Sequence, residues 1–69
     1  MELVYNKKSK EMDLFVRVLD TKTYIGHVEN VEKYSLFDDA NGYISLWDAN
    51  SEQIACFYCV ASVKVNEEE

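Results

Sequence analysis

The chain has 69 residues, 48% of them hydrophobic, and its 13 acidic and seven basic side chains give a formal net charge of −6. This length predicts one domain spanning residues 1–69, and the hydrophobic content argues against a disordered chain. The acidity argues against a nucleic acid or an anionic membrane as the main partner, because both are bound through basic patches.

The first residues carry no signal-peptide pattern, since a basic start followed by an apolar segment is missing. No apolar run approaches the roughly 20 residues that a membrane-spanning helix needs. Two cysteines without a secretory signal indicate reduced thiols, so we expect a cytoplasmic protein that does not bind membranes.

Short stretches of alternating or β-branched residues recur along the chain, and this pattern predicts strands. In chain order the candidate strands are residues 2–5, 12–19, 23–29, 34–37, 43–48, 53–60 and 61–65. Residues 6–10 are turn-like, and a short helix that continues through Glu11 is the alternative. Residues 1–12 as a whole could therefore be a first strand, a helix or an arm. Residues 20–22 are a predicted turn, and residues 66–69 are an acidic tail.

The third candidate strand contains a glycine and the only histidine of the chain. Gly26 inside a strand predicts a β-bulge or a sharp bend. Strict alternation would place His27 on one face with Thr23 and Ile25. No nucleophile or base is picked out near His27 in the sequence, so we expect it to be structural.

Residues 41–60 hold the only Trp, both cysteines and the densest group of aromatic residues, and they predict a hairpin. Ile44 and Leu46 share one face of its first strand, and Tyr43, Ser45 and Trp47 share the other. The second strand, residues 53–60, is apolar on both faces. This indicates a central or barrel strand, or a strand with one face against a partner.

If Ile44 and Leu46 enter the core, the aromatic side chains of the opposite face lie outside. Trp and Tyr are favoured anchors of protein interfaces, so the predicted interaction site is this face with an acidic rim. Its candidate residues are Tyr43, Trp47, Asp38, Asp39, Asp48 and Glu52. The alternative is that a barrel closes over both faces and that Trp47 is core.

Two other patterns resemble chemical sites but are better explained by structure. Cys56 and Cys59 form a C-x-x-C inside a predicted strand, where a redox site would need a strand-to-helix turn and a structural zinc would need four ligands. We therefore expect buried free thiols. Residues 38–42 lack the spacing of a calcium loop and predict a hairpin turn. We expect no metal, no cofactor and no enzymatic activity.

These strands predict an all-β fold, either a small antiparallel barrel or a highly twisted meander of five to seven short strands. The alternating residues from Leu14 to Val65, with Gly26 among them and Ile54-Ala55-x-Phe57 near the end, resemble the small SH3-like and Sm-like barrels. The Sm-like RNA-binding role does not carry over, because the basic and Gly-Asn loop character is missing. The chain also resembles short acidic proteins of phages and mobile elements of Gram-positive bacteria.

The function expected from this pattern is a small acidic interaction protein, which binds another protein through a β-surface or an acidic face. The resemblance to phage proteins implies an accessory factor or an inhibitor of a host enzyme, and a homodimer is a further option. The alternative is a barrel that binds a small ligand or a single-stranded nucleic acid. It requires aromatic residues on one face beside the few bases, such as Arg17, Lys22 and Lys64.

Overall fold

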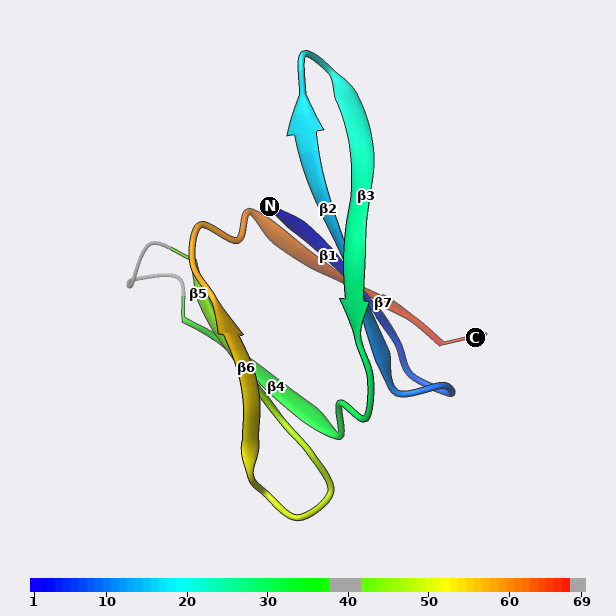
Figure 1. Cartoon of the computed structure of the whole chain (residues 1–69), viewed down its shortest axis with the longest axis vertical. Helices are drawn as coiled ribbons and strands as arrows, with labels where there is room; N and C mark the ends of the chain where they lie inside the picture. The colour runs from blue at the N-terminus through cyan, green and yellow to red at the C-terminus, as the bar shows by residue number, and fades with distance from the viewer. Residues whose placement is uncertain (38–41, 68–69) are drawn as a thin grey trace.

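The computed structural model describes residues 1–37 and 42–67 and is all-β, with two sheets (Figure 1). The strands are β1 (Glu2–Asn6), β2 (Glu11–Val18), β3 (Thr21–Val28), β4 (Lys33–Phe37), β5 (Tyr43–Trp47), β6 (Gln53–Phe57) and β7 (Ser62–Asn66). They match the predicted strands within one or two residues, except that β6 ends at Phe57 instead of residue 60. The helical alternative through Glu11 is wrong, because residues 7–10 form a turn and Glu11 is already the first residue of β2.

The strands form one sheet in the order β3-β2-β1-β7 and a second sheet in the order β4-β5-β6. The two sheets do not close into a barrel, so the barrel form of the prediction is wrong. The fully antiparallel arrangement is also wrong, because β1 and β7 pair in parallel. A short hairpin forces the two strands that it joins to run antiparallel. β1 and β7 lie near opposite ends of the chain and are not joined by a hairpin, so they are free to pair in parallel.

The core lies between the two sheets. Its buried hydrophobic side chains are Leu3, Tyr5, Met12, Leu14, Val31, Ile44, Leu46 and Val60. Strand alternation correctly placed Ile44 and Leu46 on the face that enters this core. Val31 and Val60 lie outside any strand, so alternation could not identify them as core residues. The buried Tyr5 hydroxyl donates to the carbonyl of Val31 over 2.7 Å and ties the segment after β3 to β1.

A β-bulge interrupts the pairing of β2 with β3, as Gly26 predicts. Leu14 pairs with Gly26 and Phe15 pairs with Tyr24, so Ile25 is the extra residue. Beyond the bulge, His27 pairs with Asp13. The face predicted for His27 is therefore wrong, since the extra residue reverses the alternation between Thr23 and His27.

The hairpin of β2 and β3 extends beyond the rest of the molecule (Figure 1). Its turn lies at Leu19 and Asp20, which have positive φ angles of 49° and 68°. The turn predicted at residues 20–22 is correct for Asp20, but Thr21 and Lys22 already belong to β3. Leu19 is 93% exposed. A leucine in this left-handed conformation is unusual, since asparagine and glycine adopt it at lower cost.

Asn66 belongs to β7 and pairs with Asn6 of β1, so the predicted tail at residues 66–69 starts too early. Glu67 follows the strand and forms an exposed ion pair with Lys7 over 3.4 Å. Within residues 1–37 and 42–67, no helix is long and apolar enough to span a membrane.

Candidate functional site

The outer face of the three-stranded sheet, away from the core, collects aromatic side chains from three segments. Ile44 and Leu46 of β5 are fully buried in the core, so the alternating residues of β5 point outward. Direct strand partners share a face, which adds residues from β4 and β6. We call this surface the aromatic face; its members are Phe37, Tyr43, Ser45, Trp47, Cys56 and Tyr58.

The rings of the aromatic face contact one another in a row. The ring centroid of Tyr43 lies 6.0 Å from that of Phe37 and 4.9 Å from that of Tyr58. Ser45 donates its hydroxyl to the Tyr43 hydroxyl over 2.9 Å and holds the central ring in place. The outer two rings keep large exposed fractions, 45% for Phe37 and 65% for Tyr58.

Trp47 is half-buried at the other end of the aromatic face. It is not among the buried core residues, so the alternative of a core tryptophan is wrong. The ammonium of Lys33, its cross-strand partner, lies 5.3 Å from the centroid of its ring. A cation over an aromatic ring is an attractive contact, and it covers part of the indole.

Of the acidic rim predicted around this face, only Asp48 and Glu52 are among the described residues. Asp48 uses one carboxylate oxygen to accept the backbone N–H groups of Asn50 and Glu52, at 2.9 and 3.0 Å, so it stabilises the turn after β5. The side chain of Glu52 is exposed. Asp38 and Asp39 lie outside the described residues.

Both cysteines are free and exposed, so the prediction of buried thiols is wrong. The physical reason is the position of β6, which is an edge strand of its sheet and ends before Tyr58. Cys59 follows in a left-handed conformation with φ 61° and belongs to no strand.

A second surface lies on the outer face of the four-stranded sheet, where three bases meet two aromatic rings. We call it the basic face; its members are Phe15, Arg17, Lys22, Tyr24 and Lys64. The rings of Phe15 and Tyr24 make an edge contact with centroids 5.6 Å apart, and Lys22 lies 4.5 Å from the Phe15 centroid. Arg17 is paired with Glu2 through a 3.0 Å contact, and this hydrogen bond lowers the pKa of the Glu2 carboxyl.

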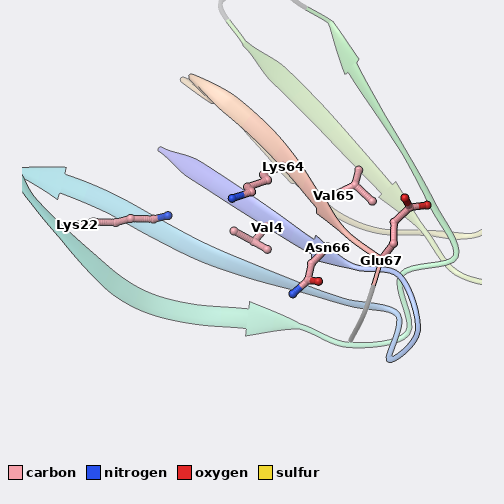
Figure 2. Close-up of a pocket in the computed structure, with 6 residues that line it drawn as sticks. All are labelled: Val4, Lys22, Lys64, Val65, Asn66 and Glu67. Atoms are coloured by element: carbon pink, nitrogen blue, oxygen red, sulfur yellow. The ribbon is translucent and has the colours of Figure 1, made fainter.

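An open hollow of about 490 Å³ lies next to the basic face (Figure 2). Its lining residues are Val4, Lys22, Lys64, Val65, Asn66 and Glu67. The side chains of Lys22 and Lys64 extend toward each other above Val4 (Figure 2). In the described part of the chain neither lysine forms an ion pair, so the two ammonium groups give the hollow a positive character.

Three side chains that can bind a metal ion come together at the far end of the same sheet. Glu11, His27 and Glu29 each offer a ligand atom, and these atoms all lie within 4.8 Å of one another. Sequence reasoning missed this group because the bulge moves His27 to the face that carries Glu11. Gly26 indicated the bulge from the sequence. Only the strand pairing shows that the bulge places His27 on the same face as Glu11.

Comparison with protein-family models, with curated proteins and with solved structures finds no match to this chain.

Proposed function

We propose that this chain is a small, non-enzymatic interaction protein that binds another protein through the aromatic face. The observation that supports this most is the row of contacting rings with Phe37 and Tyr58 exposed at its ends. Large aromatic side chains dominate the binding energy of protein interfaces when they become buried. An exposed row of this kind is otherwise costly to solubility.

The chemistry of the partner follows from the charge of the chain. The net charge of −6 favours a partner whose apolar centre has a basic rim, because complementary charges speed association and exclude acidic surfaces. Glu52 supplies negative charge at one end of the face, and the predicted acids Asp38 and Asp39 are part of the same proposal. An acidic β-protein of this kind suits an inhibitor that offers carboxylates to a nucleic-acid enzyme. The resemblance to SH3-like folds and to short acidic phage or mobile-element proteins belongs to the same hypothesis.

The test compares tagged wild-type protein with a Phe37→Ser/Tyr58→Ser variant in capture experiments from lysate of the source organism. Leu19→Asn is the matched control, because Leu19 is an exposed apolar residue at the far hairpin turn. A partner captured in stoichiometric amounts is then purified and its affinity is measured by calorimetry. We expect at least tenfold weaker binding for the double variant and unchanged binding for the control.

Two results would contradict the proposal. Binding that survives in the double variant but fails in Leu19→Asn would move the site to the β2–β3 turn. The second result is a homodimer. If light scattering gives the purified protein twice the mass of one chain, and the Tyr58 substitution restores the mass of one chain, the aromatic face serves self-association instead.

A second candidate function is the binding of a small anionic ligand or a single-stranded nucleic acid on the basic face. The specific observation in its favour is that Arg17, Lys22 and Lys64 share a face with Phe15 and Tyr24. Aromatic rings stack on bases while ammonium groups attract phosphates. Overall acidity opposes this candidate, so it ranks second.

The test is fluorescence anisotropy of a labelled oligothymidine at low salt, with inorganic phosphate and a mononucleotide as competitors. Lys22→Ser/Lys64→Ser should abolish binding, whereas Lys8→Ser, an exposed lysine elsewhere, should leave it unchanged. Binding must weaken as salt rises. No binding at low salt for all three probes excludes this candidate.

A further inference from the structure

Glu11, His27 and Glu29 bring the ligand types of a metal site together, with ligand atoms that all lie within 4.8 Å of one another. Met12 pairs with Val28, so Glu11, which precedes Met12, lies across the strand pair from Glu29. His27 pairs with Asp13 on the same outer face. This end of the sheet therefore presents three carboxylates around the only imidazole of the chain.

These carboxylates lack a permanent cation among the described residues. Like charges facing each other across a strand pair are destabilising. Lys10 forms its ion pair with Glu32, and Asp13 accepts a hydrogen bond from the Asn6 amide over 2.8 Å. In the described chain Glu29 can form an ion pair only with His27, and only when that ring is protonated, while Glu11 has no ion-pair partner. A bound divalent cation would remove this repulsion.

A side chain outside the group holds the histidine ring in a binding orientation. The Tyr24 hydroxyl lies 2.9 Å from Nδ1 of His27, and Nε2 faces Oε1 of Glu29 at 3.4 Å. In the tautomer with its proton on Nδ1, His27 donates to the Tyr24 oxygen and directs the Nε2 lone pair toward the carboxylates. Histidines that bind metals are oriented by such a hydrogen bond at the other ring nitrogen.

The spacing of the ligand atoms fits a small tetrahedral ion. Bonds of about 2.0 Å in tetrahedral geometry place neighbouring ligand atoms about 3.3 Å apart, close to the 3.4 Å between Nε2 of His27 and Oε1 of Glu29. All the ligand atoms lie within 4.8 Å of one another, so binding requires the Glu11 carboxylate to approach Nε2 of His27 and Oε1 of Glu29. One imidazole and two carboxylates leave a fourth position for water.

We propose that Glu11, His27 and Glu29 bind a divalent first-row transition-metal ion such as Zn²⁺, with Tyr24 as the positioning residue. Imidazole selects such an ion over Mg²⁺ and Ca²⁺, which prefer oxygen ligands alone. The bulge at Ile25 and Gly26 makes the site, because it brings His27 and Tyr24 to the same face as Glu11.

The test is calorimetric titration of the full, untagged chain with ZnCl₂, with the His27 ring signals followed by NMR. We expect one saturable site that shifts the His27 signals. His27→Gln and Glu11→Gln should each weaken binding by at least tenfold, and Tyr24→Phe by about tenfold. Glu52→Gln, which removes the same charge at a distant turn, should bind as the wild type does. Circular dichroism checks that each variant is folded.

The exposed cysteines provide the competing explanation, so a Cys56→Ser/Cys59→Ser variant is titrated in parallel. It should retain full affinity. Loss of binding in this variant together with retention in His27→Gln would overturn the proposal. No saturable binding at millimolar Zn²⁺, or equal affinity for Mg²⁺ and Zn²⁺, would overturn it as well.

Discussion

Gly42→Ala should be among the most destabilising single substitutions in this protein. Gly42 has a φ of +71°, and a Cβ at this position would lie 2.3 Å from the carbonyl oxygen of Val60 and 2.8 Å from its nitrogen. The same two residues are joined by a backbone hydrogen bond, in which Val60 N–H donates to the Gly42 carbonyl over 2.9 Å. Val60 is a member of the core, so it cannot move away freely.

The expected cost is the sum of three effects. The left-handed conformation costs a residue with a Cβ about 1–2 kcal/mol. Weakening the hydrogen bond to Val60 costs about 1 kcal/mol, and displacing the Val60 side chain from the core costs about 1 kcal/mol more. The total of about 3–4 kcal/mol is most of the roughly 5 kcal/mol expected for a small domain.

The assay is equilibrium unfolding in urea, followed by Trp47 fluorescence and circular dichroism. Gly26→Ala is the matched control, because Gly26 also has a positive φ, +149°, but a Cβ added there would meet no atom of another segment within 4 Å. Its cost is backbone strain alone, about 1–3 kcal/mol. If Gly42→Ala lowers the free energy of unfolding no more than Gly26→Ala does, the close approach of Val60 is not a determinant of stability.

Three further substitutions test individual contacts. Tyr5→Phe leaves the buried Val31 carbonyl without its 2.7 Å hydrogen bond and should cost about 1–3 kcal/mol in urea unfolding. Leu19→Asn replaces a leucine held in the left-handed conformation by a residue that adopts it at lower cost. It should raise the melting temperature and increase the free energy of unfolding by about 0.5–1 kcal/mol, and a lower stability would contradict the strained turn. Arg17 lowers the pKa of Glu2, so their pairing stabilises the fold above the ordinary carboxyl pKa and is lost as the pH falls through the lowered pKa. Arg17→Gln should raise the Glu2 pKa in an NMR titration and remove this part of the acid dependence; an unchanged pKa would contradict the pairing.

The sequence alone predicted the all-β class and nearly every strand. Alternation is strong in β2 and β5 because one face of each strand enters the core, and it correctly grouped Ile44 with Leu46 on the buried face of β5. Gly26 correctly indicated the bulge. These features depend on neighbouring residues, so local patterns are enough to reveal them.

The aromatic face was predictable only in part. Tyr43 and Trp47 follow from the alternation of β5, but Phe37 and Tyr58 join them through pairing and ring contacts with other segments. The apolar run of residues 53–60 suggested a central or barrel strand, or a strand with one face against a partner. Its first five residues form β6, which is an edge strand, and both thiols of the run are exposed. Composition cannot distinguish these cases, because an edge strand in contact with a partner is as apolar as a central one.

By itself, then, the sequence determined the position of most strands, the buried face of β5 and the acidic charge. Only the tertiary structure decided that β1 and β7 pair in parallel, that the sheets stay separate and that Val31 and Val60 fill the core from connecting segments. It also decided that His27 meets Glu11 and Glu29. The physical reason is that strand alternation is a local property of the backbone, whereas pairing partners and the phase beyond a bulge depend on contacts between distant segments.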